Sequence, residues 1–110
     1  MEQVDRDILD WIASASGDAA LAAQIAVAEV KKRDFLRTGF LVYFAPLDAA
    51  VPVVPAGVRP VCPHLESPEL MDGAGCDLFL RNGRLHYLEV YARGGFMPEQ
   101  PEGYRLVAAA

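Results

Sequence analysis

The dipeptide Asn82-Gly83 constrains the fold of this chain more than any other sequence feature. It separates the segments CDLFLR and RLHYLEVYA, in which leucine and aromatic residues recur at the spacing of β-strands. Asn-Gly is the preferred pair in a two-residue type I′ turn, because both positions take positive φ. The sequence therefore predicts an antiparallel hairpin within residues 75–95, with a type I′ turn at Asn82-Gly83.

The turn also sets the predicted register of the two strands, and the register decides which side chains share a face. Uninterrupted pairing back from the turn places Cys76 opposite Glu89. The face expected to pack against helices then holds Leu78, Leu80, Leu85, Tyr87 and Tyr91. The outer face holds Asp77, Phe79, Arg81, Arg84, His86, Leu88 and Val90. Glu89 falls on the covered face in this register, where it is a candidate buried acid.

Two helices are expected before the hairpin. The first is predicted by apolar residues at helical spacing, which are Val4, Ile8, Trp11 and Ile12. Gly17 then provides a left-handed residue that ends a helix, and Asp18 provides a cap for the next one. The Ala-rich stretch from residue 19 to residue 33 predicts a second helix, whose basic end complements the exposed helix carbonyls.

The remaining segments differ in their proline content. Residues 40–45, FLVYFA, have apolar side chains on both faces and predict a strand that is covered on both sides. Six of the eight prolines lie in residues 46–68, so this segment predicts an extended connection with short edge strands at most. The segment YRLV, residues 104–107, is expected to add a short strand.

The expected fold is one α+β domain spanning residues 1–110. Residues 1–35 form its helical part, and residues 38–110 form mainly strand and loop. Two helices are expected to pack on one face of an antiparallel sheet of about four strands, with residues 40–45 and 77–91 at its centre. The predicted core consists of Ile8, Trp11, Leu21, Ile25, Phe40, Val42, Phe44, Leu78, Leu80, Leu85 and Tyr87.

Composition limits the classes of partner. A chain of 110 residues that is 53% hydrophobic and 23% charged has enough apolar surface to form one folded core. Fifteen acidic against ten basic residues give a net charge of -5, so a nucleic acid is not an expected partner. The start MEQVDRDILDW is unlike a secretory signal, and no run of about 18 apolar residues is available to span a bilayer. We expect a soluble, cytoplasmic protein without a membrane partner.

The residues that most often bind metals or cofactors are few. The soft ligands are Cys62, His64, Cys76 and His86. Their spacing fits no zinc-finger pattern, so no metal site is expected, and both cysteines are interpreted as free thiols. The glycines at positions 73, 75 and 83 match no phosphate-binding loop, so no cofactor is expected.

Two catalytic alternatives stay open. Cys62 and His64 are two residues apart, which places a thiol and a base on the same side of an extended segment. Glu89 is a candidate general acid or base if burial shifts its pKa. A structural role is the simpler interpretation in both cases, so no catalytic residue is assigned.

The stretch GAGCDLFLRNGRLHYLEVYARGG, with Pro98 shortly after it, resembles the carboxyl-terminal half of small uncharacterised bacterial proteins. It is also similar to the terminal hairpins of small immunity-type proteins that neutralise toxins. The resemblance covers about a fifth of the chain. It implies an α+β domain without a cofactor, and a function in binding more than in catalysis.

The outer face of the predicted hairpin has apolar side chains that two short helices do not cover. Candidate partner-binding residues on this hairpin are Phe79, Arg81, Arg84, His86 and Leu88. The cover is expected to be the proline-rich segment, a second copy in a homodimer, or a basic protein such as a nuclease toxin. The sequence thus favours a non-enzymatic protein-protein interaction module of the immunity or adaptor type. The alternative is a small enzyme or ligand-binding protein that uses Glu89 or Cys62 with His64.

Overall fold

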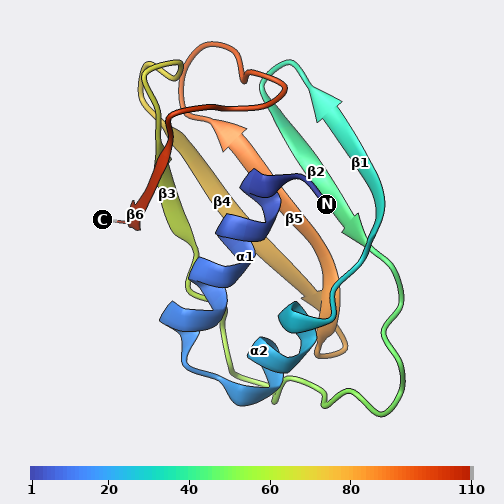
Figure 1. Cartoon of the computed structure of the whole chain (residues 1–110). Coiled ribbons are helices and arrows are strands. Elements are labelled where there is room, and N and C mark those ends of the chain that lie inside the picture. The colour runs from blue at the N-terminus through green and yellow to red at the C-terminus, as the bar shows by residue number, and fades with distance from the viewer. Residues whose placement is uncertain (110) are drawn as a thin grey trace.

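A computed structural model describes residues 1–109 and shows an α+β fold in which two helices lie on one face of a six-stranded antiparallel sheet (Figure 1). The elements are α1 (Gln3–Ser16), α2 (Ala19–Ala26), β1 (Val30–Leu36), β2 (Gly39–Phe44), β3 (Pro63–Glu66), β4 (Ala74–Arg81), β5 (Arg84–Ala92) and β6 (Arg105–Ala108). The strand order is β1-β2-β5-β4-β3-β6, so the hairpin of β4 and β5 is central. The sheet has two more strands than the four or so that the sequence predicted.

The signals at the junction of the two helices are confirmed. Gly17 follows α1 with a φ of 64°, the left-handed conformation that a residue with a side chain rarely adopts. The Asp18 carboxylate accepts a hydrogen bond of 2.9 Å from the backbone N–H of Leu21 and so caps α2. These two adjacent residues stop one helix and start the next.

The second helix is shorter than predicted. It ends at Ala26, and the residues from Val30 to Leu36 form β1, which pairs with β2. The prediction that the helix continues to Arg33 was wrong, because backbone pairing with β2 overrides the local preference of this stretch for helix. Lys31, Lys32 and Arg33 therefore lie on an edge strand and not at a helix terminus.

The hairpin has the predicted turn but a different register. Asn82 and Gly83 have φ values of 52° and 74°, as a type I′ turn requires. Leu80 lies opposite Leu85, but the next residue of β4, Phe79, lies opposite Tyr87. His86 is therefore an extra residue, a β-bulge, and every side chain from Tyr87 onward lies on the face opposite to the predicted one.

The core lies between the helices and one face of the sheet, which we call the covered face. Its buried side chains from the sheet are Phe40, Val42, Phe44, Leu65, Ala74, Cys76, Leu78, Leu85, Leu88 and Val90. The predicted core is largely confirmed, although Trp11 and Leu80 are only partly buried. Tyr87 was wrongly placed in it, since the bulge puts Leu88 and Val90 there instead. Strand β2 is also covered on only one face, because Leu41 and Tyr43 are half-exposed.

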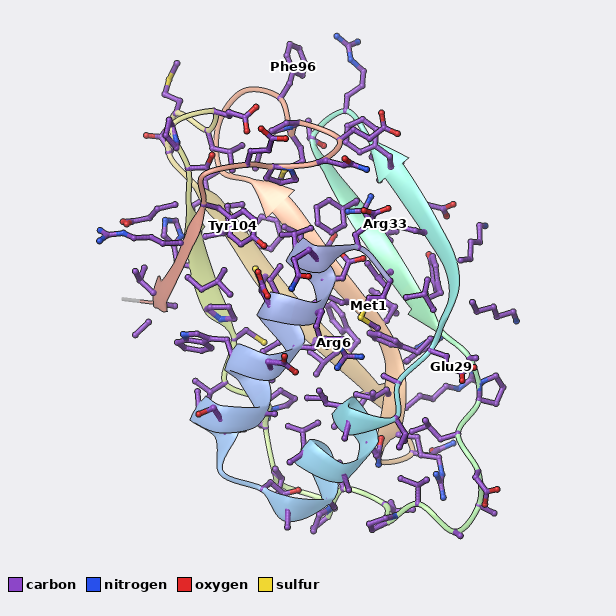
Figure 2. All side chains as sticks on the ribbon, viewed as in Figure 1. Met1, Arg6, Glu29, Arg33, Phe96 and Tyr104 are labelled. Carbon is purple, nitrogen blue, oxygen red and sulfur yellow. The ribbon has the colours of Figure 1, made fainter. Side chains whose placement is uncertain are left out.

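Helix α1 is attached to both edges of the sheet. The fully buried Asp5 carboxylate forms an ion pair with Arg33 on β1, with 3.2 Å between oxygen and Nε. The Tyr104 hydroxyl, next to β6, donates a hydrogen bond to the Asp7 carboxylate. Figure 2 shows Arg33 and Tyr104 on opposite sides of the amino-terminal part of α1. The amino-terminal part of α1 is thus held by polar contacts from both edges of the sheet.

One acidic group in each of these two contacts has a raised pKa. Burial raises the pKa of Asp5, and the nearby Arg33 guanidinium opposes only part of this effect. Burial, together with the Asp7 carboxylate, raises the pKa of the Tyr104 phenol to about 12. Both groups therefore keep their protons to a higher pH in the folded chain than in the unfolded one.

The proline-rich segment packs beside the hairpin turn. The buried Gln24 amide donates hydrogen bonds of 2.8 Å to the carbonyls of Pro52 and Gly83 and accepts one of 3.0 Å from the Leu85 N–H. Strand β3 begins at Pro63, a strand-start position that tolerates the missing N–H.

Among the described residues, neither helix is long or apolar enough to cross a bilayer.

Candidate functional site

The sheet surface that faces away from both helices is the candidate site, and we call it the open face. Figure 1 shows α1 and α2 on the same side of the sheet. All open-face positions other than glycine are half-buried or exposed, whereas the side chains on the covered face of β2 are buried. An antiparallel sheet often leaves one face to water, but that face is then mostly polar.

The strand registers align the open-face residues in rows that run across the sheet. The first, the aromatic row, consists of Lys32, Tyr43, Tyr87 and Phe79. The second, the acidic row, consists of Asp34, Leu41, Glu89 and Asp77. The third, the tyrosine row, consists of Leu36, Gly39, Tyr91, Gly75, His64 and Val107. Successive rows are about 7 Å apart, the length of two residues of a strand.

The aromatic row is a continuous set of ring contacts. Phe79 and Tyr87 stack with 4.5 Å between ring centroids, and Tyr43 and Tyr87 are 5.6 Å apart. The His86 ring, which projects from the bulge, meets Tyr87 edge to face at 5.1 Å. Phe79 remains 38% exposed, so the proline-rich segment does not shield it. Such a row offers flat apolar area that is already ordered before a partner binds.

The acidic row contains two carboxylates that lie directly opposite each other on the central strands. These are Asp77 on β4 and Glu89 on β5. Within the described chain neither forms an ion pair, whereas Asp34 at the end of the row pairs with Lys32 at 3.3 Å. Like charges opposite each other destabilise a sheet. Attraction between charged groups of the chain therefore does not account for this pair.

The tyrosine row is organised around Tyr91. The ring lies across Gly75 on the neighbouring strand, where an added Cβ would be 2.2 Å from the Tyr91 Cζ. Burial raises the pKa of the Tyr91 phenol, and the nearby Asp77 carboxylate adds to this effect. The Arg93 guanidinium lies 5.7 Å from the Tyr91 ring centroid. Gly75 is thus required for the close approach of the ring, because no side chain fits there.

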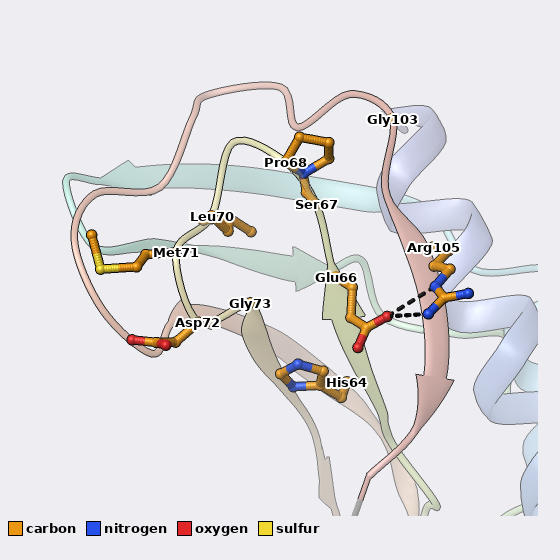
Figure 3. Close-up of a pocket in the computed structure, with 10 residues that line it drawn as sticks. All are labelled: His64, Glu66, Ser67, Pro68, Leu70, Met71, Asp72, Gly73, Gly103 and Arg105. Atoms are coloured by element: carbon orange, nitrogen blue, oxygen red, sulfur yellow. Dashed lines mark hydrogen bonds and ion pairs between the residues drawn. The ribbon is translucent and has the colours of Figure 1, made fainter.

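A hollow of about 470 Å³ lies beside His64 at the β3 end of the sheet (Figure 3). Arg105 pairs with Glu66 at 2.8 Å across one wall, and Asp72 and Gly73 line the other. The His64 Nδ1 accepts a hydrogen bond of 3.1 Å from the Arg93 Nε. Three charged groups in and beside the hollow, those of Arg105, Glu66 and Arg93, therefore already have partners in the same chain.

The two cysteines lack the surroundings of a nucleophile. Burial raises the pKa of the Cys62 thiol, and it raises that of Cys76 to about 12. A reactive thiol needs a lowered pKa. The Cys62 thiol lies 3.9 Å from the Pro60 carbonyl, its hydrogen-bond acceptor, and no hydrogen bond joins it to His64 in residues 1–109. Both cysteines are unpaired thiols, and the described chain brings no three metal-binding side chains together.

The structure separates the residues that the sequence grouped as candidate partner contacts. Phe79 and Arg81 are exposed on β4, and the half-exposed His86 forms the bulge beside them. Leu88 has no exposed surface, so its placement on the outer face was wrong. Arg84 uses its guanidinium to hold three carbonyl groups of the proline-rich segment, those of Asp48, Ala49 and Val51.

Glu89 lies on the open face and is half-buried, so its placement on the covered face was wrong. Tyr87 lies beside it for the same reason, since the bulge at His86 moves both residues to the other side. The predicted register concealed the acidic row, which pairs Glu89 with Asp77. A histidine between Leu85 and Tyr87 carries no sequence signal for a bulge, so the row could not be found without the structure.

Comparisons with known proteins add no relative. No protein-family model matches the chain, and no curated protein or solved structure matches it. The resemblance of the hairpin to immunity-type proteins therefore stays a prediction.

Proposed function

We propose that this protein is a non-enzymatic protein-protein interaction module of the immunity or adaptor type, and that it binds its partner through the open face. One observation carries the proposal. The central strands present stacked aromatic rings beside two carboxylates without basic partners, and no other part of residues 1–109 covers them. Exposed apolar patches of this kind, bordered by polar groups, are typical of protein-binding surfaces.

A protein fits this face better than a small ligand does. The three rows run across the sheet and present a broad surface without the enclosure that a small molecule needs. The hollow beside His64 is open, and three polar side chains in its lining, those of Arg105, Glu66 and His64, already have partners in the same chain. Neither Asp77 nor Glu89 lines that hollow.

The enzyme alternative has less support in the same residues. Burial raises the pKa of Cys62, which opposes a role as thiolate. His64 directs Nδ1 to Arg93 and not to a nucleophile. Glu89 faces a second carboxylate on an open surface, where water is not excluded from any reaction.

The test is a capture experiment with matched variants. The immobilised, tagged protein is exposed to a lysate of its native host, and bound proteins are identified and the complex is then rebuilt from purified components. Phe79→Ala combined with Tyr87→Ala removes the aromatic row, whereas Met71→Ala combined with Phe96→Ala removes comparable exposed apolar groups elsewhere. The first variant should lose the rebuilt complex, and the second should keep it.

Two results would overturn the proposal. One is a rebuilt complex that survives loss of the aromatic row with unchanged affinity. The other is a substrate turnover that disappears in Cys62→Ala or His64→Ala, which would establish the enzyme alternative instead.

A further inference from the structure

The order of charges along β4 makes the open face complementary to itself. From the hairpin turn inward, the strand presents Arg81, then Phe79, then Asp77 on this face. Arg81 is exposed and forms no ion pair within the described part of the chain. A cation and an anion therefore lie on either side of the aromatic row, each about 7 Å from it.

We propose that two copies of this protein pair face to face through their open faces, about a twofold axis that lies along the aromatic row. This inference rests on the proposed function, because it names a second copy as the occupant of the same surface. Rotation about that axis brings Arg81 of each copy opposite Asp77 of the other. Phe79 and Tyr87 then meet their own counterparts on the axis.

The dimensions of packed sheets suit this arrangement. Two sheets that pack face to face lie about 10 Å apart, with their strands within about 30° of alignment. The side chains of Arg81 and Asp77 together span such a gap beside the rings. A closed twofold interface forms every contact twice, so one cation and one anion per chain give two ion pairs. Glu89, opposite Asp77 in the acidic row, adds a second oxygen acceptor for each guanidinium.

The same rotation limits how far the contact extends. Lys32, at the β1 end of the aromatic row, would approach Lys32 of the second copy. Its ion pair with Asp34 offsets the charge, and the twist of the sheet carries the edge strand away from the axis. The interface is therefore centred on β2, β5 and β4 and leaves the hollow beside His64 accessible.

Charge reversal tests the pairing directly. Sedimentation velocity is measured on the full chain from about 10 µM to 1 mM, with the unchanged protein expected to approach twice the mass of one chain at the upper end. Arg81→Glu and Asp77→Arg should each raise the dissociation constant about tenfold or more, because like charges then face each other. Arg59→Glu changes an exposed charge in the proline-rich segment and should leave the constant unchanged.

Combining the two charge reversals tests whether residues 81 and 77 pair with each other across the interface. The variant that carries both reversals should dimerise again, since the new carboxylate at position 81 of each copy faces the new guanidinium at position 77 of the other. A mixture of the two single variants should form a one-to-one complex, although neither associates alone. In that mixed pair both contacts join opposite charges. This result also shows that neither single variant has lost its fold.

Three results would overturn the inference. They are a monomer at 1 mM, a dimer that neither reversal weakens, and single variants that dissociate but do not associate when mixed. A monomer that still loses its rebuilt complex on removal of the aromatic row would leave the proposed function in place with a different occupant.

Discussion

The covered face and the open face belong to the same strands, but they differ in whether their charged and polar groups have partners. Against the covered face, the buried Asp5 of α1 has Arg33 as its partner, and the buried Gln24 amide of α2 uses both its nitrogen and its oxygen. On the open face Asp77 and Glu89 lie opposite each other without a cation. The charged and polar groups at the covered face therefore stabilise the fold, whereas the two opposed carboxylates on the open face do not, which supports the proposal that the open face binds another molecule.

Deletion of His86 together with Tyr87 is expected to have the largest effect, because it exchanges the two faces of the rest of β5. After this deletion Leu88 and Val90 turn outward, while Glu89 and Tyr91 turn into the core. We expect loss of the cooperative unfolding transition, measured by circular dichroism in urea. Deletion of His86 alone is the control, because it removes the bulge but keeps Leu85 opposite Leu80 and Tyr87 opposite Phe79, and this variant should still unfold cooperatively. A double-deletion variant of normal stability would show that the spacing after Leu85 does not set the faces.

Substitutions of two neighbouring basic residues on β1, one on each face, compare the two faces directly. Arg33→Met leaves the buried Asp5 carboxylate without its partner and should lower the free energy of unfolding by about 3–5 kcal/mol at pH 7. Lys32→Met on the open face should change it by less than about 1 kcal/mol. Urea titrations of both variants give the two values.

The effect of Arg33→Met should also depend on pH. The folded-state pKa of Asp5 is raised above its ordinary value of 3.8. The contribution of this carboxyl group to folding stability is therefore fully present below pH 3.8 and is lost as the pH rises through the folded-state pKa. Protonation removes the unpaired charge that the variant leaves buried. The loss of unfolding free energy in Arg33→Met should therefore become smaller as the pH falls toward 4. A loss that stays constant over this range would contradict the pairing of Arg33 with a buried Asp5 carboxylate.

The adjacent residues Leu88 and Tyr87 provide the next comparison. Leu88→Ala opens a cavity in the core and should lower the free energy of unfolding by about 2–5 kcal/mol. Tyr87→Ala removes ring contacts on the open face and should lower it by only about 0.5–1.5 kcal/mol. Chemical denaturation at low micromolar protein separates the two, and equal losses would mean that Tyr87 is a core residue after all.

Asp77→Asn is expected to have the smallest effect on stability, with the opposite sign. Removing one of two opposed carboxylates should raise the free energy of unfolding of dilute protein by about 0.2–1 kcal/mol. Asp34→Asn, which breaks the pair with Lys32, is the control and should not stabilise the chain. A loss of stability in Asp77→Asn would indicate a structural role for the acidic row.

The sequence predicted the local elements of this fold better than their pairing. The caps at Gly17 and Asp18 and the turn at Asn82-Gly83 depend on neighbouring residues, and all three are confirmed. The end of α2 and the bulge at His86 depend on how strands pair with each other, and both were missed. The candidate site inherits this limit, since Phe79 and Arg81 were placed correctly while Leu88 and Glu89, which follow the bulge, were not.

The hydrogen bond between Tyr104 and Asp7 also bears on the order in which the chain folds. It joins residues 97 positions apart, whereas the central hairpin closes through a two-residue turn. Closing a longer loop loses more chain entropy, so contacts between the two ends form after the hairpin and its neighbours are in place. The same contacts are the first to open in the native state, because β6 is a short edge strand. Amide protons of β6 should thus exchange with solvent well before those of β4 and β5, so that the chain ends fray while the two central strands persist.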